Sequence, residues 1–319
     1  MKVSLIFTIK NEESNIELLL NSIENQTRTP DEIVIVDGGS SDNTLNIIKI
    51  IINNYTIPIK LISKQNINIS KGRNIAIKQT KNDIIACTDA GCKLDPNWLK
   101  NLTNPFEKNS NLDIITGNYK PYGENDFENI VAALLFPKIG KFKTKVNKFL
   151  PSSRSVAFRK KCWEEVKGYP ENLYTAEDTL FDIKLKKKGF NFEFAENAIV
   201  FWRMRPNIKS LFKQYFNYRR GDGRAKLFFP RYWGPKYVIY ALGFLLIIYS
   251  LVDPASLFVL LILSLIYLSG HTLIVYINTK IKKSLLLVPI IVLAIDISGL
   301  IGYFFGLMDR LRYKNTFRG

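Results

Sequence analysis

Polar residues follow several short apolar runs of the chain, at the points where those runs end. Thr8 and Glu12 come at the end of the first run, Asp37 directly follows the second, and Asp89 follows the fourth. If the runs are neighbouring parallel strands, these residues meet at the sheet edge where open α/β folds bind their ligands. Carboxylates at such an edge can accept hydrogen bonds from a base or ribose, or support a metal-bound diphosphate.

Two helical stretches begin with charged residues that suit phosphate and proton chemistry. Arg73 and Asn74 lie in the first turn of one stretch, where a guanidinium and helix amides can contact phosphate. Glu177 and Asp178 begin another, expected over 176–188. Each motif alone also fits a turn, a cap or an N-terminal acid. Their shared position at one sheet edge favours the functional interpretation.

The elements that would position these residues follow from the apolar pattern. The runs are rich in Ile and Val, lack strict alternation, and cover 3–9, 32–36, 59–62, 83–88 and 113–116. Such runs are typical of strands buried on both faces of a parallel sheet. Helical spacing separates them, for example over 44–52, and a later strand is expected over 192–201. The pattern predicts an α/β fold.

Several enzyme classes are excluded by what the sequence lacks. No G-x-G-x-x-G follows the first strand and no G-x-x-x-x-G-K-[ST] occurs, so dinucleotide dehydrogenases and P-loop NTPases are excluded. The single histidine, His271, lies in an apolar segment, which leaves no Ser-His-Asp triad. The three cysteines have no zinc spacing and suit a reducing cytosol. The N-terminus runs straight into a strand, and we expect no signal peptide.

The net charge of +17 is concentrated in two stretches, 138–161 and 203–236, each of +9. Both place apolar residues at helical spacing between lysines and arginines. This pattern favours helices lying in a bilayer interface, although a core-facing helix with a solvated face remains the alternative. The apolar stripes suit a membrane better than nucleic acid, so no nucleic-acid partner is expected.

The C-terminal quarter contains two to three segments that suit a membrane. They cover about 237–252, 254–279 and 284–308, and Asp296 is their one charged residue. About 20 apolar residues span a bilayer, so a multi-pass region is expected. Lysines between the second and third segments favour a cytoplasmic loop. Three full spans would place the basic C-terminus outside, against that tendency, so the number of spans stays open.

The order of the motifs resembles the family 2 glycosyltransferases, which have the GT-A fold. The resemblance covers roughly residues 1–225. Its markers are the opening Val3-Ser4-Leu5-Ile6-Phe7-Thr8-Ile9-Lys10-Asn11-Glu12-Glu13, then Val36-Asp37-Gly38-Gly39-Ser40-Ser41-Asp42, Gly72-Arg73-Asn74, Asp89, and the Glu177-Asp178 pair. Each marker is weak alone, but the five occur in the order and spacing of the family.

The resemblance implies a nucleotide-sugar donor and a set of residues that bind it. Thr8, Glu12 and Asp37 would hold the nucleoside. Arg73 and Asn74 would lie near the ribose or diphosphate. Asp89 matches the first acid of the family's D-x-D element, which places a divalent metal (Mg²⁺ or Mn²⁺) or the ribose-diphosphate.

The resemblance also implies the acceptor side of the site. Asp178 matches the base that deprotonates the acceptor for an inverting, in-line displacement at the anomeric carbon. Glu177 and Gln214 would lie on the acceptor side. Where processive relatives carry Q-x-x-R-W, Asn217 and Tyr218 break the motif. A single sugar addition is therefore expected.

Two departures from the family pattern bear on the metal. Gly91 replaces the second acid of D-x-D, and Trp202 stands where many relatives place a histidine. Both changes remove metal ligands. A divalent cation is still expected, because the donor diphosphate can itself supply ligands.

Together these features predict a GT-A domain followed by an all-α membrane region. The expected parts are a nucleotide-sugar-binding half (1–119), an acceptor half with interfacial helices (120–235) and a transmembrane region (236–319). The predicted activity is transfer of a sugar to a lipid phosphate or lipid-linked glycan at the cytoplasmic face of the cell membrane. The alternatives are a polysaccharide-building glycosyltransferase and a membrane protein that binds nucleotide sugars without catalysis.

Overall fold

The computed structural model describes residues 1–136, 151–227 and 230–312. The chain forms two compact units. The first comprises Met1–Tyr122 and Phe142–Arg203, and the second Gly123–Lys141 and Met204–Gly319.

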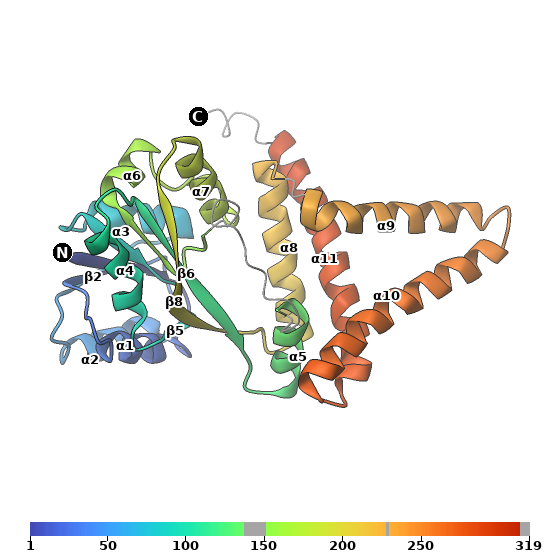
Figure 1. Cartoon of the computed structure of the whole chain (residues 1–319), viewed down its shortest axis with the longest axis horizontal. Helices are drawn as coiled ribbons and strands as arrows, with labels where there is room; N and C mark the ends of the chain where they lie inside the picture. Colours follow the sequence, from blue (N-terminus) through green and yellow to red (C-terminus); the bar gives the residue numbers. More distant parts are fainter. Residues whose placement is uncertain (137–150, 228–229, 313–319) are drawn as a thin grey trace. The chain divides into compact units, whose positions relative to one another are not determined.

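The first unit alternates strands and helices along the chain (Figure 1). Its strands are β1 (Val3–Ile9), β2 (Glu32–Asp37), β3 (Ile59–Ser63), β4 (Ile84–Cys87), β5 (Cys92–Leu94), β6 (Ile114–Tyr122), β7 (Val156–Arg159) and β8 (Phe192–Arg203). Its helices are α1 (Ile16–Glu24), α2 (Thr44–Ile52), α3 (Ile69–Lys78), α4 (Trp98–Lys108), α6 (Lys160–Glu165) and α7 (Glu177–Lys187).

The strands form one mixed sheet in the order β3-β2-β1-β4-β7-β6-β8-β5. The first four strands of this order are parallel, and β7 pairs antiparallel with both β4 and β6. The carboxyl ends of β1, β2 and β4 therefore lie side by side. This is the sheet edge at which the sequence predicted the binding residues.

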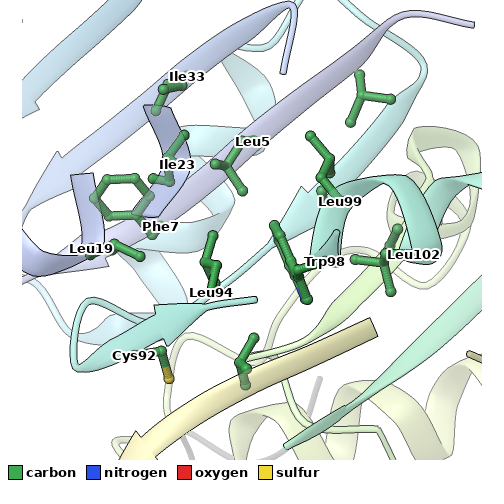
Figure 2. Packing of buried hydrophobic residues seen from close by; sticks show 14 of the residues in the cluster. Leu5, Phe7, Leu19, Ile23, Ile33, Cys92, Leu94, Trp98, Leu99 and Leu102 are labelled. Carbon is green, nitrogen blue, oxygen red and sulfur yellow. The ribbon is translucent and has the colours of Figure 1, made fainter. Parts of the chain in front are cut away.

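The larger apolar core lies between the sheet and helices α1, α2 and α4. Figure 2 shows Trp98, Leu99 and Leu102 of α4 in this core, with Phe7 of β1 and Leu94 of β5. Trp98 is fully buried, and its indole Nε1 donates to Ser155 Oγ at 2.9 Å. Burial of an aromatic side chain with its one donor satisfied fixes α4 against the sheet.

The predicted strands and helices agree closely with the observed ones, but two short strands and the helices α6 and Asp126–Leu135 were not predicted. The strand 3–9 and the helix 44–52 begin and end as predicted, while β6 and β8 extend beyond the expected runs. Strands β5 and β7 were not predicted. They are three and four residues long, and their antiparallel pairing is set by distant strands rather than by a local pattern.

The second unit is helical. It contains α5 (Asp126–Leu135), α8 (Ile208–Ala225), α9 (Pro230–Tyr249), α10 (Ala255–Thr279) and α11 (Ser284–Arg312). Helix α8 lies along α11 (Figure 1). Glycines allow the close approach: a Cβ on Gly302 would lie 2.3 Å from the Phe216 carbonyl oxygen, and one on Gly306 would lie 2.2 Å from that of Arg220. Part of the apolar stripe of α8 thus packs on α11, and its placement at a bilayer interface stays a prediction.

Among the described residues, α10 and α11 are long and apolar enough to cross a membrane, and α9 holds a shorter apolar stretch, Val238–Tyr249. Asp296 of α11 is buried and accepts hydrogen bonds from Lys236 Nζ at 2.8 Å and Tyr267 Oη at 2.7 Å. It therefore faces the other helices of the unit. Most of the first basic stretch, residues 138–150, lies outside the described residues.

Candidate active site

The loops that follow β1 and β2 are bonded to each other. The Asn11 amide donates to Ser40 Oγ at 2.9 Å, and the Glu12 amide donates to Thr44 Oγ1 at 2.8 Å. The strand register places Ile9 of β1 opposite Asp37 of β2. Glu12 and Asp37 are therefore brought to one end of the sheet, as the sequence predicted.

Asp37 ends β2 and is fully buried. Its carboxylate accepts hydrogen bonds from the Gly39 and Ser40 amides at 3.2 and 3.0 Å, from Ser40 Oγ at 2.6 Å and from Ser63 Oγ at 2.9 Å. Gly39 has a φ of +89°, a left-handed conformation that favours glycine. The turn thus folds back over the carboxylate and satisfies its charge with neutral donors.

Helix α3 packs closely on the end of β1 at Thr8. A Cβ on Gly72 would lie 2.8 Å from Thr8 Cγ2, so only glycine fits there without movement of its neighbour. Asn68 begins this helix, with its side-chain oxygen accepting from the Lys71 amide at 2.9 Å. The close approach brings the next residue, Arg73, to the carboxyl end of β4, where it contacts Asp89.

Arg73 joins two parts of the site that are far apart in sequence. Its Nη2 lies 2.7 Å from Asp89 Oδ1 and its Nη1 lies 2.7 Å from Glu177 Oε1. The side chain is 2% exposed. Burial alone would lower the pKa of Arg73, but the nearby carboxylates of Asp89 and Glu177 raise it well above its usual value. The guanidinium therefore stays charged and holds both carboxylates.

Asn74 uses its whole side-chain amide within the protein. Its Nδ2 donates to the Tyr169 carbonyl at 2.9 Å and to Glu171 Oε1 at 3.0 Å. Its Oδ1 accepts from Trp163 Nε1 and from the Tyr169 amide, both at 2.9 Å. Four hydrogen bonds satisfy an asparagine side chain. Asn74 thus fastens α3 to the turn that precedes α7.

The Glu177-Asp178 pair begins α7 behind a strained residue. Ala176 has a φ of 65°, which is costly for a residue with a Cβ. Glu177 is buried, whereas Asp178 is half-buried and accepts a hydrogen bond from the Thr179 amide at 2.7 Å. Burial, with the negative charge of Asp178, raises the pKa of Glu177. Of the two acids, Asp178 is therefore the more accessible.

A further acid lies one helical turn beyond Asp178. Asp182 is buried, and its Oδ2 has no hydrogen-bond partner among the described residues. Burial, together with the charge of Asp178, raises the pKa of Asp182 well above its usual value. The sequence placed Asp178 and Asp182 on one helical face, but it did not indicate that Asp182 is buried.

Asp89 lies between two arginines. Besides its bond to Arg73, its Oδ2 is 3.9 Å from Arg154 Nε. The guanidinium carbon of Arg154 lies 3.9 Å from the centre of the Trp202 ring and 5.0 Å from that of Tyr119. Sequence analysis missed Arg154 because it counted the residue in the first basic stretch, whose pattern indicated a membrane surface. No local pattern in the sequence distinguishes it from its neighbours.

The remaining predicted residue, Gln214, lies on α8 in the second unit. It is buried, and its Nε2 donates to Tyr218 Oη at 3.0 Å. For metal binding, the described residues contain no group of three or more His, Cys, Asp or Glu side chains that could hold an ion. Asp89 is the one acid of the predicted metal element, and its Oδ1 already bonds to Arg73.

Comparison with known families identifies this arrangement. The sequence model of Glycosyl transferase family 2 matches residues 4–166 of the chain. The chain belongs to glycosyl transferase family 2. The resemblance drawn from its motifs is confirmed, and the protein is a glycosyltransferase.

Individual relatives of this family 2 glycosyltransferase agree with that assignment. The O-antigen chain rhamnosyltransferase RfbN of Salmonella typhimurium is 25% identical over 227 residues, covering 68% of this chain and 71% of RfbN. The glycosyltransferase AglE of Haloferax volcanii is 27% identical over 236 residues, covering 70% of this chain and 73% of AglE.

A solved structure shows that the fold is shared. The mannosyltransferase PcManGT of Pyrobaculum calidifontis, solved with GDP-Man and Mn²⁺, is 15% identical and superimposes with a TM-score of 0.57. The match covers 98% of this chain and 87% of that one. The GT-A fold with a C-terminal helical region, predicted from the sequence, is confirmed.

Proposed function

We propose that this glycosyltransferase moves a sugar, with inversion, from a nucleotide-sugar donor to a lipid phosphate or lipid-linked glycan at the cytoplasmic face of a membrane. The observation that carries the proposal is the buried Arg73, which fixes Asp89 and the start of α7 side by side. Asp89 belongs to the donor element and Asp178 follows Glu177 at the acceptor side. A reaction between a bound donor and an incoming hydroxyl needs these two parts held together.

The donor would lie at the carboxyl edge of β1, β2 and β4. Thr8, Glu12 and Asp37 surround the predicted nucleoside position, and Asp89 the ribose and diphosphate. Arg73 is buried and bonded to two carboxylates, and the side-chain amide of Asn74 is fully bonded within the protein. The carboxylate of Asp37 is likewise buried and bonded within the protein. We therefore assign Arg73, Asn74 and Asp37 to the support of the donor site rather than to direct contact.

The chemical step would use Asp178 as the general base. The carboxylate takes the proton of the acceptor hydroxyl as the hydroxyl oxygen attacks the anomeric carbon. The bond between that carbon and the phosphate oxygen breaks on the opposite face, and the nucleoside diphosphate leaves with the bonding electrons. Glu177 keeps Asp178 in place through its bond to Arg73. The product has the inverted anomeric configuration.

The helices of the second unit support a membrane-bound acceptor. Helices α10 and α11 could span a membrane, and lysines occupy the turn between them. The positive-inside tendency favours a cytoplasmic position for that turn, and a further crossing by the apolar stretch of α9 would put the catalytic part on the same side. The relative RfbN is named for O-antigen chains. The broken Q-x-x-R-W motif at Asn217 and Tyr218 supports a single addition.

The three proposed parts of the chain divide these tasks. Residues 1–119 bind the donor, residues 120–235 bind the acceptor, with Gln214 near it, and residues 236–319 anchor the enzyme in the membrane. A divalent cation at Asp89 stays a prediction. The mannosyltransferase neighbour was solved with Mn²⁺, but the acids described at this site do not form a metal centre by themselves, and the step above uses no ion.

Substitution of Asp178 tests the reaction. The full-length Asp178→Asn enzyme, in membranes that contain lipid acceptors, is supplied with a panel of labelled nucleotide sugars. Loss of the general base should lower transfer by roughly 10²- to 10⁴-fold, while binding of the nucleoside diphosphate should change little. Glu17→Gln, which alters an exposed carboxylate on α1, is the matched control and should keep full activity.

Two results would contradict the proposal. Transfer by Asp178→Asn at the control rate would remove Asp178 from catalysis. Transfer by the wild type to a soluble sugar, with no incorporation into the lipid fraction, would contradict the membrane-bound acceptor.

A further inference from the structure

The two departures from the family's metal-binding pattern lie next to each other in the structure. Gly91 directly precedes β5, and Trp202 of β8 pairs with Cys92 in the antiparallel register of β5 and β8. The positions at which relatives carry the second acid and the histidine are therefore neighbours in this structure. Asp89, which remains, lies at its border.

A cationic side chain occupies this same region. The Arg154 guanidinium carbon is 3.9 Å from the centre of the Trp202 ring, within cation-π distance. Its Nε is 3.9 Å from Asp89 Oδ2. The Arg154 guanidinium thus lies over the face of Trp202, which stands where many relatives place a histidine. It also lies beside Asp89, the remaining acid of the D-x-D element.

The backbone holds Arg154 in this position. Thr88, the residue before Asp89, donates its Oγ1 to the Arg154 carbonyl at 3.0 Å. Two residues later β7 begins, with Val156 paired to Cys87 of β4. The Arg154 side chain is 15% exposed. The pairing of β4 with β7 therefore fixes the backbone next to Arg154, and the Arg154 side chain is largely buried.

These charges disfavour a divalent cation at Asp89. Arg73 already bonds to one carboxylate oxygen and Arg154 lies within 4 Å of the other. A metal ion at that carboxylate would be repelled by two guanidinium groups at close range. Arginine, by contrast, binds phosphate oxygens directly through paired N–H donors.

We propose that Arg154 binds the diphosphate of the nucleotide-sugar donor in this enzyme and takes the place of a metal ion. The proposal rests on the proposed function. As the bond from the anomeric carbon to the β-phosphate oxygen breaks, its electron pair stays on that oxygen. Arg154 donates hydrogen bonds to the developing charge, which stabilises the leaving group electrostatically. Donor binding then needs no divalent cation.

Nucleotide binding by the full chain in lipid nanodiscs tests this directly. UDP, GDP, dTDP and CDP are titrated calorimetrically, and the tightest binder is studied further with its monophosphate. Its affinity should be equal in EDTA and in MnCl₂ to within about twofold. Arg154→Gln should weaken diphosphate binding about tenfold or more, and monophosphate binding less, because charged hydrogen bonds are lost.

Two further variants guard against misfolding and unspecific charge effects. Lys161→Gln removes a positive charge whose side chain is 59% exposed, and it should bind the diphosphate as the wild type does. Arg154→Lys keeps the charge without the paired donors, and it should bind with intermediate affinity. If Arg154→Gln does not fold, judged by its melting curve, the EDTA comparison and Arg154→Lys still decide the proposal.

Two substitutions should make diphosphate binding by this enzyme depend on a metal ion. A Cβ on Gly91 would meet no atom within 4 Å, and Gly91 is not in the left-handed backbone region. Gly91→Asp combined with Arg154→Gln rebuilds a two-acid element and removes one of the two competing cations, so that Arg73 alone remains beside Asp89. This double variant should bind the diphosphate in MnCl₂ but not in EDTA, and should take up Mn²⁺ in electron paramagnetic resonance.

Three outcomes would overturn the proposal. Wild-type diphosphate binding that disappears in EDTA and returns with Mn²⁺ would show that a metal ion does this work. Unchanged diphosphate affinity in a folded Arg154→Gln variant would remove Arg154 from the site. If the wild type binds no nucleoside diphosphate in either condition, the donor assignment fails and this proposal fails with it.

Discussion

Replacement of Arg73 by methionine would test whether the ion pairs at the centre of the site hold its two halves together. The methionine side chain fills a similar space but leaves the carboxylates of Asp89 and Glu177 without their shared cation. Both bonds are 2.7 Å long, and the Arg73 side chain is 2% exposed. Glu177 is 8% exposed and Asp89 31% exposed, so most of the cost should arise at Glu177.

The expected loss follows from this burial. Removal of one partner from a buried ion pair costs about 3–5 kcal/mol, because the other charge remains buried. Glu177→Gln keeps an acceptor for Arg73 and should cost only about 1–2 kcal/mol. In the double variant no charge is left uncompensated at position 177. Its loss should be about 2 kcal/mol smaller than the sum of the two single losses.

The assay is thermal unfolding of the full chain in detergent at pH 8, followed by near-ultraviolet circular dichroism. A loss of 3–5 kcal/mol corresponds to a fall in Tm of roughly 10 °C for a unit of this size. At pH 6 the fall should be smaller, because burial raises the pKa of Glu177 to about 7 and the residue then already carries a proton.

Lys71→Met is the matched control, since it removes an exposed positive charge two residues earlier on α3. It should leave Tm nearly unchanged. The reasoning would be refuted if Arg73→Met melted like this control, or if the single losses simply added in the double variant. Either result would mean that Arg73 is not the cation that compensates Glu177.

Two further predictions concern pH and helix packing. Burial raises the pKa of Glu177 from 4.5 to about 7. Between these values the folded chain keeps a proton on Glu177 that the unfolded chain releases. The proton-linked stabilisation of the folded state is therefore complete at low pH and is lost as the pH rises through 7. The wild-type Tm should therefore fall between pH 5 and pH 8, and by less in Glu177→Gln; equal falls in both would contradict the assignment. In the second unit, Gly302→Ala should lower the Tm of the helical unit by several degrees, because its Cβ would lie 2.3 Å from a carbonyl oxygen of α8. Gly270→Ala on α10, where a Cβ meets no atom within 4 Å, should leave it unchanged or raise it, and similar behaviour of both variants would count against close packing of α8 on α11.

Much of the fold could be predicted because its elements carry local signals. The apolar runs of β1, β2 and β4 are buried almost throughout, and such burial favours runs rich in Ile and Val. Strands β5 and β7 escaped prediction because they are short and are stabilised by partners far along the chain. The predicted strand ends also placed Thr8, Glu12, Asp37 and Asp89 at one edge, since parallel strands end on the same side.

What each site residue does was harder to predict than which residues lie at the site. Arg73 was expected to contact phosphate, but it is buried between Asp89 and Glu177, which lies 104 residues away. Asn74 is expected near the donor, and the structure shows in addition that its hydrogen bonds hold the turn before α7. Arg154 was counted in the basic stretch 138–161, whose pattern favoured a membrane interface. In each case the residue type was informative, but its partners come from distant segments.

The sequence by itself determined the family, the order of the strands along the chain and the set of acids available for catalysis. These depend on residue types and short spacings, which are local properties. Only the tertiary structure decided which acid is buried and which is accessible. It also decided which arginine joins Asp89 to Glu177 and which lies between Asp89 and Trp202. Burial and ion pairing depend on contacts between segments that no local pattern specifies.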